Sequence, residues 1–278
     1  MNLPPLDAPG LLRRYGLRPD KRLGQNFLID QAALQAVTAA AAIQPGDSVL
    51  EIGPGLGSLT RCLAAQASRV VAVELDGDLL PPLREALQPF DNVEIIQGDI
   101  LALNPASLMP ASGYLVVANI PYYITSALIR HLLESAHRPQ RPQRLVLTVQ
   151  NEVARRICAQ PGELSLLALS VQVYGAPRRL TVIPANAFYP APKVDSAVVR
   201  VDLFPEARFP AAQLNLFFRL AKAGFSQKRK TLRNALAGGM RWSPSEAQVH
   251  LENAGIDPQR RAETLSLEEW ERLVEEVS

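Results

Sequence analysis

The sequence predicts a mostly parallel α/β domain followed by a small all-α domain. Between about residues 30 and 150, short β-branched runs alternate with segments of helical periodicity, which is typical of βαβ units in a parallel sheet. Beyond residue 204 the strand pattern ends and only helical signals remain. We therefore expect a first domain over residues 1–204, with a basic N-terminal segment at 1–30, and a helical second domain over 205–278.

Seven candidate strands make up the predicted sheet, and they lie at residues 48–52, 70–75, 93–97, 114–119, 145–150, 180–182 and 197–203. Helical segments, such as residues 59–67 and 126–134, lie between the first five strands. Right-handed crossovers then place helices on both faces of the sheet. The last two strands flank a Pro-rich loop at 184–193, so we expect them to form an antiparallel hairpin at one edge of the sheet.

Two capping boxes mark the helical domain. Ser243 is followed by Pro244 and then Glu246, and Ser266 is followed three residues later by Glu269. A serine with a glutamate three residues on satisfies the first free N–H groups of a helix, and proline is favoured at the first helical position. We expect helices to begin at both sites.

Composition excludes several classes of protein. The 278 residues are 47% hydrophobic, enough for an ordinary globular core, and the formal charge is only +2. Cys62 and Cys158 form no CxxC pair and the three histidines lack ligand spacing, so we expect neither a disulfide scaffold nor a metal site. The sequence has no apolar run of membrane-spanning length and no signal-peptide pattern. We expect a cytoplasmic protein, with a monomer as the default.

The basic residues are clustered, although the net charge is small. One group lies before the first expected helix (Arg13, Arg14, Arg18, Lys21, Arg22), and a second lies between residues 207 and 245, where no acidic residue occurs (Arg208, Arg219, Lys222, Lys228, Arg229, Lys230, Arg233, Arg241). Either group alone is typical of a solvated helix face. Two clusters beside a catalytic-looking domain favour binding of RNA or DNA.

The first strand runs into a glycine-rich loop whose residues 51–60 read EIGPGLGSLT. A glycine turn between a strand and a helix lets the backbone approach a ligand, which makes Gly53 and Gly55 candidate binding residues. Ser58 stands where the dinucleotide fingerprint requires glycine, and the Lys-Ser/Thr of a P-loop is absent. The E-x-G-x-G-x-G spacing is similar to the S-adenosylmethionine (SAM) motif of class I methyltransferases; a tight turn without a ligand is the alternative.

Two carboxylates support a nucleoside site beside this loop. Glu74 ends the second strand and Asp99 follows the third. The carboxyl ends of parallel strands share one edge of a sheet, where an acid can accept hydrogen bonds from ribose hydroxyls. We assign the ribose to Glu74 and an adenine amino group to Asp99.

The segment after the fourth strand reads Asn119-Ile120-Pro121-Tyr122 and predicts transfer to an exocyclic amine. The Asn119 side-chain oxygen and a backbone carbonyl near Pro121 can accept the hydrogens of an adenine N6 amine. Tyr122 offers a ring face for stacking the base, and Phe188 could cover the other face or instead belong to the core. SAM is a strong electrophile, so placement and desolvation would supply most of the rate.

These motifs together resemble those of the KsgA-type small-subunit ribosomal RNA adenine dimethyltransferases, which are class I SAM methyltransferases with a Rossmann-like fold. The resemblance covers nearly the whole chain and includes residues 21–28, 51–60, 74–76, 98–99, 119–122, 150–156, 188–196, 224–234 and 261–265. One departure is Tyr123, where many members have asparagine.

The resemblance implies SAM-dependent dimethylation of the N6 amines of two adjacent adenosines near the 3′ end of small-subunit (16S) rRNA, with a role in ribosome biogenesis. It implies that Asn26 and Leu28 join Gly53, Glu74, Asp99 and Asn119 around SAM. The partner would be small-subunit rRNA or an immature small subunit. We assign RNA binding to the basic residues Arg22, Lys193, Lys228, Arg229, Lys230 and Arg233.

Three alternatives stay open. An Erm-type large-subunit rRNA adenine methyltransferase would have almost the same catalytic domain, although residues 225–234 and 261–265 favour the small-subunit type. DNA adenine methyltransferases commonly have Asn/Asp-Pro-Pro-Tyr/Phe, and Ile120 does not fit that pattern. A ribosome-assembly factor whose essential role is binding is the third; the intact glycine loop and acceptor motif favour retained catalysis, and both roles can coexist.

Overall fold

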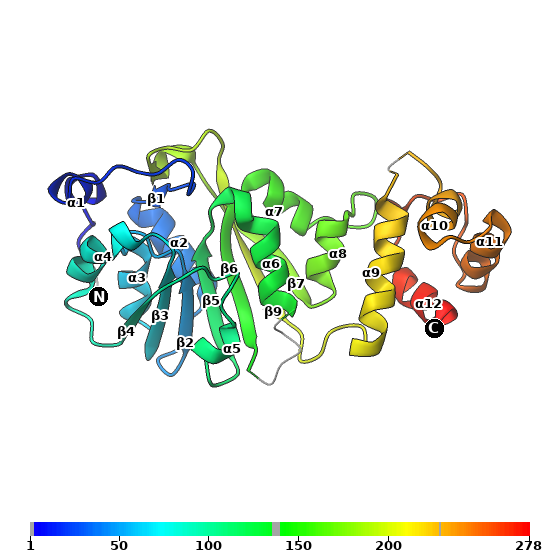
Figure 1. The fold of residues 1–278 in the computed structure, drawn as a ribbon, viewed down its shortest axis with the longest axis horizontal. Coiled ribbons are helices and arrows are strands. Elements are labelled where there is room, and N and C mark those ends of the chain that lie inside the picture. Colours follow the sequence, from blue (N-terminus) through cyan, green and yellow to red (C-terminus); the bar gives the residue numbers. More distant parts are fainter. Residues whose placement is uncertain (1–2, 135–139, 228) are drawn as a thin grey trace. The chain divides into compact units, whose positions relative to one another are not determined.

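The computed structural model describes residues 3–134, 140–227 and 229–278 (Figure 1). The chain divides into two compact units, one formed by Met1–Ala154 and Ala176–Leu203, the other by Arg155–Gly175 and Phe204–Ser278. Residues 155–175 therefore group with the helical unit, whereas we expected them within the first domain.

A seven-stranded sheet forms the core of the first unit, in the order β4-β3-β2-β5-β6-β9-β7. Its strands are β2 (Ser48–Ile52), β3 (Arg69–Glu74), β4 (Val93–Gln97), β5 (Tyr114–Asn119), β6 (Pro142–Gln150), β7 (Gly175–Ile183) and β9 (Ser196–Leu203). The strands β2, β3, β4, β5 and β6 run parallel to one another. Strand β9 runs antiparallel to β6. The order confirms the predicted parallel sheet, and β9 with β7 occupies the edge predicted for the hairpin.

The central strands are apolar because both of their faces are covered. In β3, Val70, Val71 and Ala72 are fully buried, as continuous β-branched runs in parallel sheets usually are. Helix α2 (Gln31–Ala41) precedes the first strand of this sheet, and the helices α3 (Ser58–Ala64), α4 (Leu80–Leu87), α5 (Pro105–Leu108), α6 (Thr125–Glu134) and α7 (Asn151–Ile157) follow successive strands. Helices α2 and α3 pack against each other, and α6 lies on the opposite face of the sheet (Figure 1).

The edge strand β7 is longer than the predicted residues 180–182. Most of its side chains are exposed and two are arginines, so it lacks the alternating apolar pattern from which strands are recognised. Strand β6 likewise begins at Pro142, three residues before its predicted start, because proline is tolerated at the first position of a strand.

The N-terminal segment contains a helix that the sequence pattern did not indicate. Helix α1 (Ala8–Arg14) begins with the Asp7 side chain accepting the Gly10 N–H at 2.9 Å, and it includes Arg13 and Arg14 of the first basic cluster. A short strand, β1 (Phe27–Leu28), then pairs antiparallel with β8 (Phe188–Tyr189). This ribbon joins residues near the start of the chain to the Pro-rich loop.

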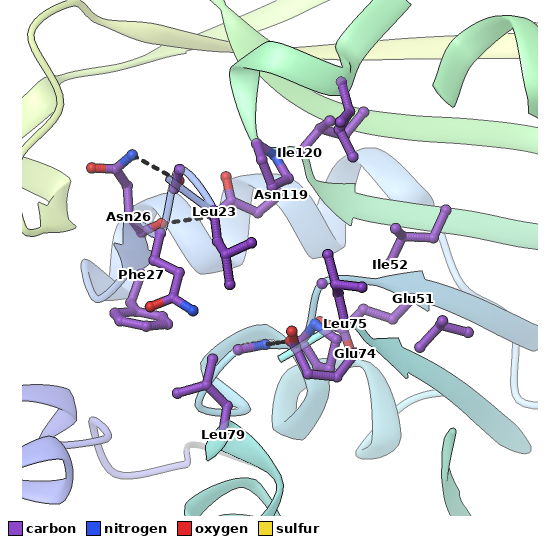
Figure 2. A pocket seen from close by; sticks show the side chains of 18 of the residues that line it. Leu23, Asn26, Phe27, Glu51, Ile52, Glu74, Leu75, Leu79, Asn119 and Ile120 are labelled. Carbon is purple, nitrogen blue, oxygen red and sulfur yellow. Dashed lines mark hydrogen bonds between the residues drawn. The ribbon is translucent and has the colours of Figure 1, made fainter. Parts of the chain in front are cut away.

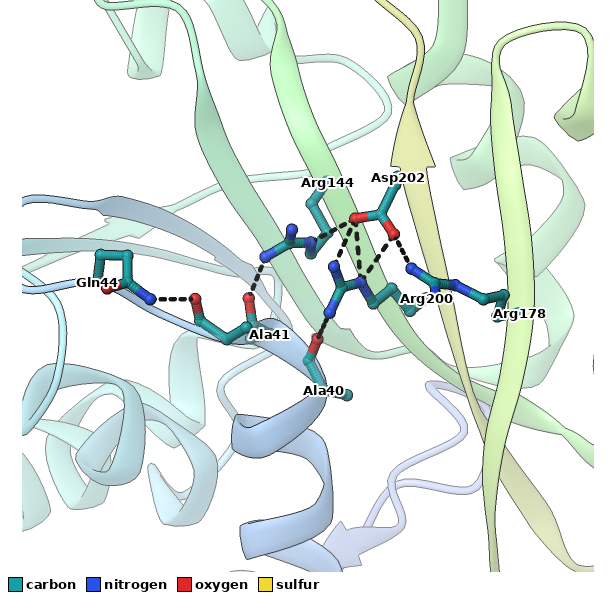
Figure 3. A network of polar contacts seen from close by, with 8 residues as sticks. Ala40, Ala41, Gln44, Arg144, Arg178, Arg200 and Asp202 are labelled. Carbon is teal, nitrogen blue, oxygen red and sulfur yellow. Dashed lines mark hydrogen bonds and ion pairs between the residues drawn. The ribbon is translucent and has the colours of Figure 1, made fainter.

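A polar network fastens the last strands to α2 (Figure 3). The Asp202 carboxylate accepts hydrogen bonds from Arg144, Arg178 and Arg200. Partial burial opposes ionisation, but the three guanidinium groups hold the pKa of Asp202 well below its usual range. Arg144 and Arg200 also donate to the carbonyls of Ala41 and Ala40 at 2.7 and 3.3 Å, which satisfies carbonyls left free at the C-terminal end of a helix.

The second unit is helical, as predicted, and consists of α8 (Leu166–Gln172), α9 (Ala211–Phe225), α10 (Leu232–Met240), α11 (Pro244–Asn253) and α12 (Leu267–Val277). Both predicted capping boxes are present at the starts of α11 and α12. Trp270 of α12 is fully buried and stacks on Phe225 of α9.

Residues 155–175 belong to this unit because their contacts lie there. Helix α8 packs against α9, and the carbonyl of Tyr174 accepts the Phe204 N–H at 2.9 Å. The Glu263 carbonyl also accepts the N–H groups of Gly162 and Leu164. These contacts are long-range in sequence, so periodicity alone could not place the segment.

Candidate active site

A pocket opens at the carboxyl ends of β2, β3 and β5, where the sequence placed the candidate residues (Figure 2). Residues 23–28 of the N-terminal segment and Phe188 complete its wall. Every predicted cofactor-binding residue lines this pocket: Asn26, Leu28, Gly53, Gly55, Glu74, Asp99 and Asn119.

The glycine loop requires its glycines. Gly53 and Gly55 have positive φ angles of 70° and 58°, which other residues rarely adopt. A Cβ atom on Gly55 would also lie 2.9 Å from the ring of Phe27. The absence of side chains keeps the loop backbone open to the pocket while Phe27 packs against it.

Glu74 holds this loop in place. One carboxylate oxygen accepts the Gly55 N–H and the other accepts the Asp76 N–H, both at 2.9 Å. Burial raises the pKa of Glu74, and these two hydrogen bonds oppose the rise. Asp99 is more exposed, and its Oδ1 accepts the Leu101 N–H at 2.9 Å, which orients the carboxylate.

Glu51, the first residue of the motif, is a site residue that the sequence analysis did not single out. Its side chain lines the pocket and is only 1% exposed. Among the described residues, its Oε2 atom has no hydrogen-bond partner. Burial raises the pKa of Glu51 to about 8; the nearby Thr60 hydroxyl opposes the rise, and the charge of Glu74 adds a smaller contribution to it. Such an unpaired buried oxygen is costly unless a ligand supplies a donor.

Asn119 is held by the N-terminal segment (Figure 2). Its Nδ2 donates to the Asn26 carbonyl at 3.0 Å, and the Asn26 side chain donates to the Gly24 carbonyl at 3.0 Å. Because the nitrogen of the Asn119 amide is engaged, its Oδ1 is left as an acceptor at the pocket.

The residues after Asn119 form a turn that fixes Tyr122. The Pro121 carbonyl accepts the Ile124 N–H at 3.2 Å, and the Tyr122 hydroxyl hydrogen-bonds to Ser196 Oγ at 2.8 Å. Burial raises the pKa of Tyr122. Ser196 is fully buried at the start of β9, so this tether orients the ring.

Phe188 belongs to the apolar core and also lines the pocket. It is only 4% exposed and packs in the apolar cluster that contains Leu28, Ile183 and Ala187, yet it also lines the pocket. The β1–β8 ribbon sets its position, since Leu28 pairs with Phe188. Whether it touches a substrate base stays a prediction.

The predicted RNA-binding residues fall in both units. Arg22 and Lys193 are exposed in the first unit, where Arg22 forms an ion pair with Asp20 at 2.9 Å. In the second unit Arg229 and Lys230 are exposed, and Arg233 is partly buried with its guanidinium donating to Gln248. Lys228 lies outside the described residues.

Several pocket residues carried no local sequence signal. Phe27 and Leu75 look like ordinary apolar positions, and Gln25 reaches the site through a hydrogen bond to Asp76 at 2.6 Å. Only the fold brings these residues together. Of the three, Leu75 was the easiest to predict as a pocket residue, because it directly follows the strand-end acid Glu74.

Comparison with known proteins agrees with this site. A family model described as ribosomal RNA adenine dimethylase matches residues 17–278. The chain belongs to the ribosomal RNA adenine dimethylase family. A relative from Dehalococcoides mccartyi, named ribosomal RNA small subunit methyltransferase A, is 46% identical over 96% of this chain and 91% of its own length. One of the same name from Alkaliphilus metalliredigens is 39% identical over 99% of this chain and 97% of its own.

Solved structures show the same fold for this family member. A dimethyladenosine transferase from Plasmodium falciparum superposes with a TM-score of 0.76 at 25% identity, covering 89% of this chain and 95% of the other. The 23S rRNA methyltransferase ErmE gives a TM-score of 0.73 at 29% identity, covering 90% and 99%. The predicted methyltransferase fold and enzyme class are confirmed.

Two findings concern metal binding and membrane spans, neither of which the sequence led us to expect. Across the described ranges, no group of three or more His, Cys, Asp or Glu side chains is placed to hold a metal ion. Among the helices that the structure describes, none has both the length and the apolar character needed to cross a membrane.

Proposed function

We propose that this family member uses SAM to dimethylate the N6 amines of two adjacent adenosines near the 3′ end of small-subunit rRNA. The observation that carries the proposal is the Asn119 amide. Its nitrogen donates a hydrogen bond to the Asn26 carbonyl, which leaves its oxygen as an acceptor at the pocket. The glycine loop and two strand-end carboxylates line the same pocket.

The chemistry of the pocket fits SAM. Glu74 has lone pairs left for the ribose hydroxyls, and Asp99 has a free oxygen for the adenine amino group. Leu75 and Ile100 follow these two acids and supply apolar walls for the adenine ring. The unpaired oxygen of Glu51 suits the ammonium group of the methionine portion.

The chain's own residues would then hold the target amine. SAM supplies a methyl group on a positively charged sulfur. The Asn119 Oδ1 accepts one hydrogen of the N6 amine, which favours the pyramidal nitrogen needed for attack. Because the Pro121 carbonyl already accepts the Ile124 N–H, the Ile120 carbonyl is the better second acceptor. Tyr122, with Phe188 opposite, would hold the base by stacking.

The choice of the small subunit rests on the relatives. Those named ribosomal RNA small subunit methyltransferase A are 39–46% identical over nearly the whole chain, compared with 29% for the 23S enzyme ErmE. We propose rRNA, free or within an immature small subunit, as the partner, and the cytoplasm as the location.

Mapping the methyl groups tests this function. Purified protein and methyl-labelled SAM are incubated separately with unmodified small- and large-subunit rRNA and with the corresponding subunits. Nuclease digestion and mass spectrometry then locate the label. We expect dimethyladenosine at two adjacent positions of small-subunit rRNA. Label confined to large-subunit rRNA would support the Erm-type alternative instead.

A further inference from the structure

Tyr123 differs from the other aromatic residues of the pocket because its ring is exposed. It lines the pocket, yet 58% of its surface is accessible to solvent. Its neighbour Tyr122 is half-buried, and its hydroxyl is tied to Ser196. No hydrogen bond from the Tyr123 hydroxyl to another described residue is formed, so nothing polar fixes the ring.

One edge of the Tyr123 ring is supported by the N-terminal segment. A Cβ atom on Gly24 would lie 3.4 Å from two ring carbons of Tyr123 and 3.3 Å from Pro121 Cβ. Gly24 has a positive φ of 64°, so the chain bends at this contact. The ring therefore lies beside the N-terminal segment, and more than half of the residue's surface is free to contact a ligand.

The surroundings of Tyr123 suit a nucleic-acid strand. Lys21 and Arg22 are exposed shortly before Gly24, and Arg22 pairs with Asp20 at 2.9 Å. Aromatic rings among cations are the usual means of binding single-stranded RNA, because bases stack on the rings and phosphates meet the cations.

We propose that Tyr123 stacks on the nucleotide next to the target adenosine and so holds the RNA strand in register. This inference rests on the proposed function. Tyr122 and Tyr123 are consecutive and both line the pocket, so the nucleotide that adjoins a base stacked on Tyr122 would lie near the pocket mouth, where Tyr123 is exposed. A substrate with two adjacent adenosines would then present one base inside the pocket and one at its mouth.

The direct test measures stacking without methyl transfer. Short single-stranded RNAs carry the fluorescent base 2-aminopurine on the 5′ or the 3′ side of a central adenosine, and S-adenosylhomocysteine is present. We expect the wild-type protein to quench the fluorescence at one of the two positions. Tyr123→Phe should retain the quenching and Tyr123→Ala should lose it. Leu180→Ala, which removes an exposed apolar side chain from β7, serves as the control.

Kinetics supply a second readout. We expect Tyr123→Ala to raise KM for small-subunit rRNA by about 5- to 150-fold, the range for loss of one base–aromatic stack, with a much smaller change in kcat. Its melting temperature should match that of the wild type.

Quenching by Tyr123→Ala equal to that of the wild type, no quenching at either position by the wild type, or an unchanged KM would each overturn the proposal. If the wild-type protein methylates no rRNA, the proposed function fails, while the fluorescence measurement still decides whether Tyr123 stacks on RNA.

Discussion

The side chain of Asn119 has a structural and a chemical role at once. Its nitrogen holds the N-terminal segment through the Asn26 carbonyl, and its oxygen is the proposed acceptor for the target amine. We expect Asn119→Ala to lower kcat by about 100-fold or more, the usual cost of losing a group that acts in the transition state. SAM affinity should change by less than tenfold. Single-turnover methylation and calorimetric titration with SAM measure the two effects.

Asn119→Asp separates the two roles. It keeps an acceptor oxygen but loses the hydrogen-bond donor to Asn26. We expect it to retain more activity than Asn119→Ala at equal folded fraction. Wild-type turnover by the alanine variant would refute the role of the oxygen.

Glu51 makes the stability of the ligand-free protein depend on pH. Its pKa of about 8 in the folded protein lies above the ordinary value of 4.5, so the folded form keeps a proton that the unfolded chain releases. Stability is therefore lost as pH rises from about 5 to 8. We expect Glu51→Gln, which has no proton to lose, to gain roughly 1 kcal/mol per pH unit relative to the wild type over this range.

Urea unfolding at three pH values in the absence of SAM measures this difference. If the free energy of unfolding changes with pH by the same amount in the two proteins, the raised pKa of Glu51 is contradicted.

At the residue scale, motif spacing was enough to predict which side chains near strand ends line the pocket. Glu74, Asp99 and Asn119 line one pocket because parallel strands end at a common edge. The same reasoning missed Glu51 as a binding residue, since its significance comes from burial without a partner. Burial depends on packing from the whole fold, which no local pattern contains.

At the scale of elements, the contact between α9 and α10 depends on one glycine. A Cβ atom on Gly239 would lie 2.4 Å from Ala223 Cβ, whereas one on the preceding Gly238 would meet nothing within 4 Å. We expect Gly239→Ala to lower the free energy of unfolding by about 1–3 kcal/mol through overpacking. Gly238→Ala should raise it by up to about 1 kcal/mol because alanine favours a helix.

Thermal and urea denaturation of these two variants provide a matched comparison within one helix. Equal effects of the two substitutions would show that α9 and α10 do not approach closely at Gly239.

The elements themselves were predictable to different degrees. Strands β2, β4 and β5 have the bounds read from the sequence. The strands β2 and β5 are recognised because buried parallel strands are nearly continuous apolar runs, whereas β4 lies at the sheet edge and is only partly buried. The edge strand β7 and helix α1 were not recognised in full, since their stabilising contacts come from distant segments. The capping boxes at Ser243 and Ser266 were reliable because the motif is local.

At the scale of the whole molecule, the net charge of +2 does not show which basic residues are free to bind a partner, because some form ion pairs within the second unit. Arg208 pairs with Glu268 at 2.9 Å and with Glu271 at 3.3 Å. These contacts neutralise one member of the second basic cluster. Arg229 and Lys230 are exposed instead, so they are better candidates for phosphate contacts.

We expect the double substitution Arg229→Gln and Lys230→Gln to weaken rRNA binding and to reduce the slope of log affinity against log salt by about 1–2, because fewer counterions are released. Filter binding over a series of salt concentrations measures the slope. Arg69→Gln with Arg84→Gln removes the same charge elsewhere on the surface and should leave the slope unchanged. An equal change of the salt slope in both double variants would mean that rRNA binding depends on total charge and not on Arg229 and Lys230.

The β1–β8 ribbon has a consequence for biosynthesis. Synthesis proceeds from the N-terminus, so Phe27 and Leu28 leave the ribosome long before their partners Tyr189 and Phe188. A nascent chain that already contains the glycine loop, Glu74 and Asn119 still lacks this wall of its pocket. The proposed modifier of ribosomes therefore lacks Phe188, and with it the second ring face proposed for stacking the target base, until its own ribosome has translated past residue 188.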